Sequence, residues 1–357
     1  MGTMGLSFME LVAMRVNSRI VHCAGILICV MLLSLSGSSC RKSSVSGAGE
    51  VVLYCSVDQQ LAEPAIAEFE KRTGIRVLAR YDTEAQKTVG LVQKIIAEAA
   101  SPIADVFWSN EVSHTIRLAR QSLLTGYASD KTVNWPAGLA DAKGRWYGFA
   151  LRARVIAYNT RTVSARDAPK SLEDVLNDRW KGRIVMAAPE FGTTGSDVAS
   201  WFAHYGYDRA REILQSLKAN KIRLVSGNST AVRMVATGRA DICFTDTDDV
   251  YAAQRNNWPV AMNYLDQAGE GVLVIPNTAA LLKNAPHPVN AARLMDFLLS
   301  EELEKMLAES YSRNSPIHPN LAGRFEECLI PRPLSIDYNA IVDQLQTAVT
   351  TAGVILR

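Results

Sequence analysis

This 357-residue sequence lacks the motifs that identify most enzyme classes and most nucleic-acid-binding proteins. It has no Cys/His spacing of a zinc site, no P-loop and no dinucleotide-binding glycine pattern. It also has no nucleophile elbow and no Ser/His/Asp order typical of hydrolases. Nothing repeats, which argues against a structural or adhesive array. The net charge is only +2, so no basic surface for nucleic acid is expected.

Cysteine is also scarce. Beyond the first 40 residues only Cys55, Cys243 and Cys328 remain. An odd number argues against a disulfide framework, although one pair is possible and the sequence does not select it. Cys55 and Cys243 lie in short apolar runs, where a buried thiol is expected.

The chain begins with a segment typical of protein export. An apolar run, Ile20–Leu35, follows two arginines and is marginal in length for a spanning helix. The small residues Ser36–Ser39 precede Cys40, as at a lipoprotein cleavage site. We therefore expect residues 1–40 to be a signal peptide with lipidation at Cys40, and residues 41–49 to be a flexible tether. An uncleaved anchor helix is the alternative. Either way the rest is exported, to the periplasm or the outer face of the cell membrane.

The rest of the chain has a globular composition, with 48% hydrophobic and 21% charged residues overall. Apolar runs that predict strands alternate with helical patterns: strand Glu50–Ser56, helix Leu61–Arg72, strand Ile75–Arg80, helix Thr88–Ala100 and strand Ala104–Trp108. This order predicts an α/β fold with a mostly parallel sheet and helices on both faces. Ligands of such sheets bind beyond the carboxyl ends of the strands, where Asp58, Asn110 and Glu111 fall.

Further strands are predicted along the chain. Arg152–Tyr158 lies between two α/β patterns, as a crossover strand would, and Gly271–Ile275 could return the chain. Gly182–Ala187 and Ile222–Ser226 supply two more strands. Pro286–Met306 is typical of a pair of helices.

One acidic stretch, Gly238–Gln254, combines a strand, a polar turn and a helix. Its turn places Asp246, Asp248 and Asp249 at the edge of the predicted sheet. Three carboxylates at such an edge are suited to bind a cation. The alternative is that Asp246 or Asp248 caps the helix and that the others are solvated.

Several segments resemble the periplasmic solute-binding proteins of ABC importers, and the ferric-iron-binding proteins in particular. These segments include YCSVDQQLAEPAIAEFEKRTGIRV, SPIADVFWSNE, NSTAVRMVATGRAD and HPVNAARLMDFLLSEE. The resemblance covers nearly all of Glu50–Pro319 in order. It implies a type 2 periplasmic-binding fold with a ligand cleft between two lobes. We place the first lobe at 50–155 with 268–325 and the second lobe at 156–267 with 326–357. It also implies a monomeric receptor, not an enzyme, that works with an ABC permease and its ATPase.

The resemblance also implies a metal site. The family's histidine position falls on Asp58, and its acidic position falls on Asn110, with Glu111 beside it. The family's paired tyrosines fall on Asp248 and Asp249. The metal ligands implied in this way, or lying beside these positions, are Asp58, Glu111, Asp246, Asp248, Asp249 and Tyr251. Carboxylates are hard donors that suit Fe³⁺ and equally Ca²⁺, Mg²⁺ or Mn²⁺, while a polyamine would satisfy the same charges. If they converge without a cation, they repel one another.

The same family implies an anion, carbonate or phosphate, beside the metal. Candidate residues for it are Asn110, Arg152, Arg154, Gly192, Thr193, Thr194, Gly195, Asn228 and Ser229. Arg152 and Arg154 share one face of their strand and can clamp an anion or form ion pairs. Two other functions therefore stay open: a binding protein for an anionic organic solute, such as a phosphonate or phosphorylated compound, and a metal-dependent hydrolase.

Overall fold

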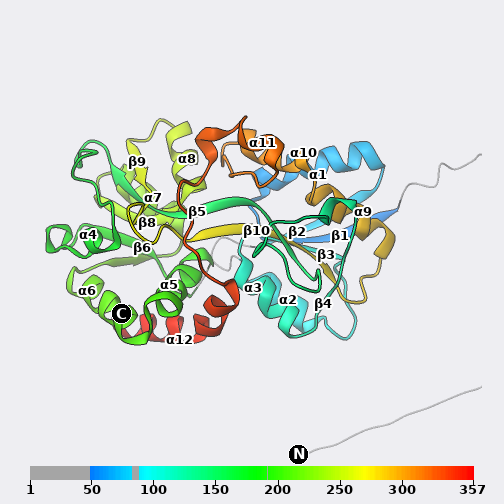
Figure 1. Ribbon diagram of the computed structural model, residues 1–357, viewed down its shortest axis with the longest axis horizontal. Coiled ribbons are helices and arrows are strands. Elements are labelled where there is room, and N and C mark those ends of the chain that lie inside the picture. Colours follow the sequence, from blue (N-terminus) through cyan, green and yellow to red (C-terminus); the bar gives the residue numbers. More distant parts are fainter. Residues whose placement is uncertain (1–48, 83–87, 191) are drawn as a thin grey trace, which may run out of the picture. The chain divides into compact units, whose positions relative to one another are not determined.

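The computed structural model describes residues 49–82, 88–190 and 192–357 (Figure 1). The predicted signal peptide, with Cys40, lies outside the described residues. Within them the strands form one sheet in the order β2-β1-β3-β10-β5-β8-β6-β7, with β4 beside β10 and β9 beside β5. Helices flank this sheet, so the predicted α/β class is confirmed.

The first half of the sheet is parallel and follows the predicted alternation. Its strands and helices are β1 (Glu50–Cys55), α1 (Gln59–Thr73), β2 (Arg76–Tyr81), α2 (Val89–Ala97), β3 (Val106–Ser109), α3 (Val112–Arg120) and β4 (Leu124–Thr125). Helix α1 ends where expected, because Gly74 adopts a left-handed φ of 68° and its N–H bonds to the carbonyl of Glu70.

Two long antiparallel strands connect this half to the rest. Strand β5 (Tyr147–Asn159) pairs with β10 (Val274–Leu282) along its first part and with β8 and β9 along its second part. The predicted crossover strand is therefore correct but starts five residues earlier. The predicted return strand at 271–275 is displaced toward the C-terminus. Its continuation, Pro276-Asn277-Thr278, is not apolar, and the register shifts there between Ile275 and Asn277.

In the second half of the sheet β6, β7 and β8 pair in parallel, and β8 and β9 each pair antiparallel with β5. This half consists of α4 (Leu172–Leu176), β6 (Ile184–Ala187), α5 (Gly192–Tyr205), α6 (Tyr207–Ala219), β7 (Arg223–Val225), α7 (Asn228–Ala236), β8 (Ile242–Asp246), α8 (Thr247–Arg255) and β9 (Val260–Asn263). The chain then returns through β10 and forms α9 (Pro288–Leu298), α10 (Glu301–Glu309), α11 (Pro319–Ala322) and α12 (Tyr338–Leu356). The described residues also form the 3₁₀ turns η2 (Asp130–Thr132), η3 (Asp178–Trp180) and η4 (Glu326–Cys328).

The last helix, α12, joins the two halves. It packs on α5 and α6 of the second half and also contacts α3 of the first half. There Arg120 Nη1 donates to Asp343 Oδ1 at 2.6 Å. Among the described residues, no helix is both long and apolar enough to cross a membrane.

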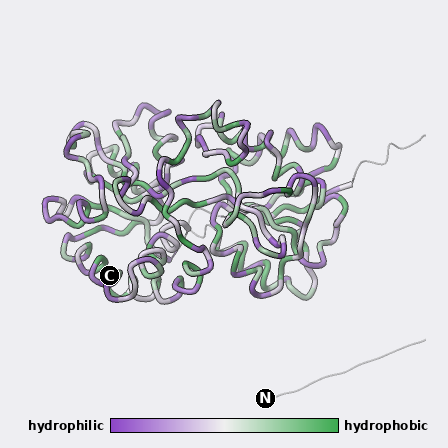
Figure 2. The backbone as a smooth tube through the Cα atoms, viewed as in Figure 1, coloured by the Kyte–Doolittle hydropathy of each residue, from purple (hydrophilic) through white to green (hydrophobic). Residues whose placement is uncertain are grey.

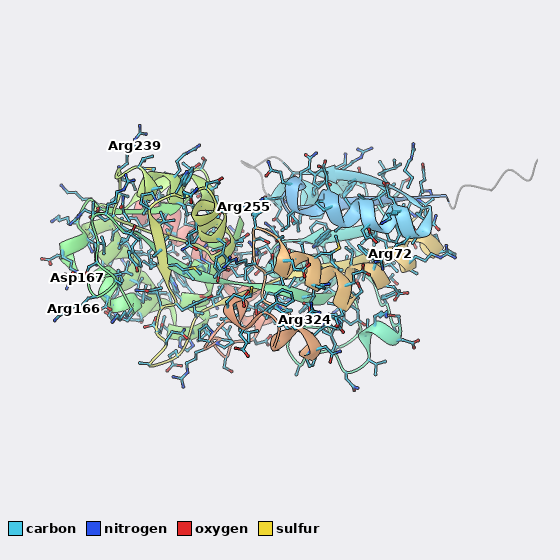
Figure 3. All side chains as sticks on the ribbon, turned by 90° about the horizontal axis from the view of Figure 1, so that it is seen from above. Arg72, Arg166, Asp167, Arg239, Arg255 and Arg324 are labelled. Carbon is cyan, nitrogen blue, oxygen red and sulfur yellow. The ribbon has the colours of Figure 1, made fainter. Side chains whose placement is uncertain are left out.

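Hydrophobic residues are frequent along the central strands, where much of the tube in Figure 2 is green. Trp108, Tyr54 and Phe149 are fully buried between the first half of the sheet and its helices. Cys55, Cys243 and Cys328 are buried and not joined by disulfides, as expected for the first two. Charged residues such as Arg166 and Arg239 extend outward from the ribbon (Figure 3). The two arginines of β5, described next, are exceptions.

Candidate functional site

A small cavity of about 40 Å³ opens where strands of both halves end. Asp58 and Asn110 reach it from the ends of β1 and β3. The second half and β5 supply Arg152, Ala187, Gly192, Thr193, Thr194, Ser226, Gly227, Asn228, Asp246, Asp248 and Asp249. This is the position at which α/β sheets bind ligands. The volume is sufficient for an ion with a few waters.

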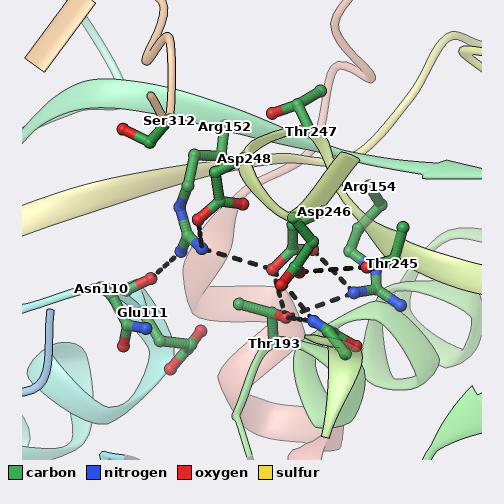
Figure 4. A network of polar contacts seen from close by, with 12 residues as sticks. Asn110, Glu111, Arg152, Arg154, Thr193, Thr245, Asp246, Thr247, Asp248 and Ser312 are labelled. Carbon is green, nitrogen blue, oxygen red and sulfur yellow. Dashed lines mark hydrogen bonds and ion pairs between the residues drawn. The ribbon is translucent and has the colours of Figure 1, made fainter. Parts of the chain in front are cut away.

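Asp246, the last residue of β8, forms the centre of a buried network (Figure 4). Its side chain is 2% exposed. Strand pairing places Arg154 directly opposite it, and Arg152 lies two residues away on the same face of β5. Arg154 Nη1 donates to Oδ1 at 2.7 Å, and Arg152 Nη1 donates to Oδ2 at 3.3 Å. Both arginines are therefore internal counterions of Asp246.

Two neutral side chains also donate hydrogen bonds to Asp246. Thr193 Oγ1 donates to Asp246 Oδ2 at 2.7 Å, and Asn228 Nδ2 donates to the same oxygen at 3.2 Å. Burial opposes ionisation, but the charges of the two arginines and the Thr193 bond outweigh it, so the pKa of Asp246 lies below its usual value. Asp246 is thus a buried, ionised carboxylate and makes no side-chain cap bond to α8.

Arg154 is shared between two carboxylates. Its Nε donates to Asp197 Oδ2 at 3.0 Å, in addition to the bond with Asp246. Although burial opposes its charge, these two carboxylates hold the pKa of Arg154 above its usual value. Burial raises the pKa of Asp197, and Arg154 offsets this only in part. The guanidinium is therefore committed to the protein and does not line the cavity.

Asp248 and Asp249 lie in the first turn of α8. Asp248 Oδ2 accepts a hydrogen bond from Arg152 Nη1 at 3.3 Å, and Asp249 Oδ2 accepts one from Thr245 Oγ1 at 3.0 Å. One carboxylate oxygen from each of Asp246, Asp248 and Asp249 lies within 4.8 Å of the other two. Carboxylate oxygens at this separation can share a hard cation.

The cavity lining is strongly acidic. Among the described residues it contains four carboxylates, those of Asp58, Asp246, Asp248 and Asp249, and one guanidinium, that of Arg152. Arg152 also donates to the main-chain carbonyl of Asn110 and so connects the second half to the first. If all four carboxylates are ionised, the lining carries an excess of three negative charges, which favours a cation over an anion.

Glu111 lies elsewhere, although it is adjacent to the cavity residue Asn110. It is fully buried and caps α3, accepting the N–H groups of Ser113 at 2.9 Å and His114 at 3.0 Å. Ser196 Oγ, on α5, donates to it at 2.6 Å. Glu111 therefore joins the two halves but does not line the cavity.

Three other candidates are also outside this cavity. Tyr251 is two residues beyond Asp249 and so points to another face of α8, where its hydroxyl donates to the carbonyl of Glu327 at 3.4 Å. Ser229 is not part of the lining, and Gly195 faces a different cavity. Sequence reasoning missed Asp197, which lies one helical turn after Thr193 on α5; this spacing was a detectable signal.

Known proteins share this architecture. Residues 101–333 match the family described as bacterial extracellular solute-binding protein. The chain belongs to this family. It is 28% identical over 286 residues to iron uptake protein A1 of Synechocystis sp., covering 77% of this chain and 76% of that protein. It is 26% identical over 283 residues to the major ferric iron-binding protein of Neisseria meningitidis serogroup B, covering 77% and 83%.

Among solved structures, iron-bound HitA from Pseudomonas aeruginosa superposes with a TM-score of 0.74 at 26% identity. The match covers 85% of this chain and 99% of HitA. The resemblance to solute-binding proteins and the expected type 2 fold are therefore confirmed.

Proposed function

We propose that this solute-binding protein is the receptor of an ABC importer and captures a hard metal ion, ferric iron foremost, between the two halves of its sheet. The observation that carries the proposal is the excess of carboxylates over guanidinium groups in the cavity lining. Fe³⁺ and other hard cations prefer such oxygen ligands. The names of the two relatives, an iron uptake protein and a ferric iron-binding protein, point the same way.

The ligand set that this geometry supports is smaller than the resemblance implied. We assign Asp58, Asp248 and Asp249 to the metal, because their carboxylates line the cavity from both halves. Asp246 also lines the cavity, but its carboxylate already accepts four hydrogen bonds within the protein, so we assign it a contribution of charge only. A carbonate or phosphate beside the metal would contact the start of α5, where Thr193 and Thr194 line the cavity.

The alternative, an anionic organic solute such as a phosphonate, is less well supported. It requires arginines that are available to the solute, and Arg152 and Arg154 are bonded to aspartates instead. We also infer binding without catalysis, since a receptor needs only to hold and release its ligand. We further propose that a lipid on Cys40 anchors the protein to the membrane and that the protein is a monomer.

Metal binding by substituted proteins tests the function. Asp248→Asn and Asp249→Asn preserve side-chain size but each remove one charged ligand. We expect the affinity for the preferred metal to fall at least tenfold, about 1.4 kcal/mol or more. Isothermal titration with ferric citrate, Mn²⁺ and Ca²⁺ measures this. Because Tyr251 points away from the cavity, ferric protein should also show little phenolate charge-transfer colour.

A matched control is available on another helix. Asp208 lies in the first turn of α6, as Asp248 does in α8, but is exposed and distant from the cavity lining. Asp208→Asn should leave metal affinity unchanged. Equal affinity of all three variants and the wild type for every metal would refute the cation site. Tighter binding of phosphate or a phosphonate by the Asp248 variant would favour the anionic solute.

A further inference from the structure

A second and larger cavity adjoins the first. It measures about 380 Å³, within the range of small-molecule sites, and lies between α3, α5 and α12. Gly192 lines both cavities. Because Gly192 has a φ of 61° and nothing lies within 4 Å of the place where a Cβ would stand, the space beside it is open.

The wall formed by α3 is basic. His114, Arg117, Arg120 and Gln121 line it at spacings of three and four residues, and therefore form one face of the helix and its end. Arg120 is engaged, because its guanidinium donates to Asp343 and to the carbonyl of Asn339. Arg117 differs: among the described residues its one side-chain bond is to His114 Nδ1, at 3.4 Å. Its remaining N–H groups can bind an anion.

A second wall, formed by α12, is mainly apolar. Val342, Leu345 and Val349 line it, again at helical spacing, with the amide of Gln346 between them. The third wall is the entry to α5. There Gly195 is required for close packing, because a Cβ would lie 2.7 Å from the carbonyl oxygen of Pro189. Glu190, the acid that the described residues contribute to the lining, is paired with Arg357.

We propose that this cavity is a second ligand site, for a small organic acid whose carboxylate pairs with Arg117 and whose hydrocarbon part packs on α12. A basic helix face and an apolar helix face in one cavity match the two ends of such a molecule. Because α3 belongs to the first half and α5 to the second, the acid contacts both. This inference stands independently of the cation site, since none of the three proposed metal ligands lines the second cavity.

Titration of the metal-free protein with hexanoate tests the proposal. Acetate has the same carboxylate without the chain, and 1-hexanol has the chain without the charge. Each buried methylene should tighten binding about fourfold, so hexanoate should bind more than tenfold tighter than acetate. It should also bind more tightly than 1-hexanol, because only the carboxylate pairs with Arg117.

Substitutions then locate the site. Arg117→Gln should weaken hexanoate binding at least tenfold, whereas Arg211→Gln, at an exposed position of α6, should not change it. Val349→Trp should fill the cavity and abolish binding. Asp249→Asn should leave hexanoate affinity unchanged even where it impairs metal binding, which separates this proposal from the cation site.

Three outcomes would overturn the proposal. They are the absence of hexanoate binding, equal affinity for hexanoate and acetate, and unchanged hexanoate affinity in Arg117→Gln. The Arg117 variant should fold normally, since it breaks only the contact with His114. Its result therefore stands even where Val349→Trp fails to fold.

Discussion

Asp246→Asn is the most informative perturbation of the buried network. The carboxylate accepts bonds from both arginines of β5, from Thr193 and from Asn228, and the side chain is 2% exposed. Asparagine preserves the size but removes the charge. It also turns an amide N–H₂ group toward donors that need an acceptor. Two buried guanidinium groups then lose one shared counterion.

The expected loss of stability follows from the burial of the pair. Removing one partner of a buried ion pair costs about 3–5 kcal/mol, because the other charge remains uncompensated. Arg154 retains Asp197 and Arg152 retains Asp248, so the lower end of this range applies. We expect the free energy of unfolding to fall by about 3 kcal/mol. For a domain of this size that lowers the Tm by roughly 6 °C.

Urea denaturation of the metal-free protein at pH 7 measures the effect. Asp343→Asn is the control, because it removes the carboxylate of an exposed pair with Arg120 and should cost under about 1 kcal/mol. The folded-state pKa of Asp246 is lowered, so its contribution is complete above the unfolded pKa of about 4 and is lost as the pH falls through the folded value. The difference between wild type and variant should shrink below about pH 4. A loss no larger than that of the control would refute the counterion role.

Two further predictions follow from other parts of the chain. Ser196→Ala removes the hydroxyl that donates to buried Glu111 across the two halves. The arrangement that holds both halves around the metal should therefore lose about 1.5 kcal/mol, and metal affinity should fall about tenfold. Unchanged affinity in titration calorimetry would contradict this. Cys40→Ala should release the protein from membranes into the exported soluble fraction, as cell fractionation can show. Retention in the membrane would favour an anchor helix over a lipid.

Most of the fold could be predicted because its signals are local. The predicted strands 50–56 and 182–187 contain β1 and β6, and the predicted helix 61–72 ends one residue before α1 does. Strand β10 was placed too early, since its second part carries Asn277 and Thr278, which no apolar-run criterion detects. The predicted lobe boundaries, 50–155 with 268–325 and 156–267 with 326–357, remain predictions.

The candidate site was harder to predict, because neighbouring residues in a turn point in different directions. Asn110 and Glu111 follow the same strand, yet the first lines the cavity and the second caps α3. Tyr251 and Asp249 share a helix but not a face. Sequence spacing identifies which strand end a residue follows, whereas its orientation depends on where the next helix begins. Helix α8 begins at Thr247 and so carries Asp248 and Asp249 in its first turn.

The arginines of β5 show why the sequence could not decide whether the ligand is a cation or an anion. Arg152 and Arg154 on one strand face can clamp an anionic solute or balance the charge of the protein's own carboxylates. The antiparallel register decides between these roles. It pairs Arg154 with Asp246, and both guanidinium groups donate hydrogen bonds to that aspartate. Carboxylates that would otherwise repel one another are then partly neutralised before any ligand arrives. A cation entering this cavity therefore meets charges that the protein has already positioned, and its affinity depends on the carboxylates that the arginines leave uncompensated.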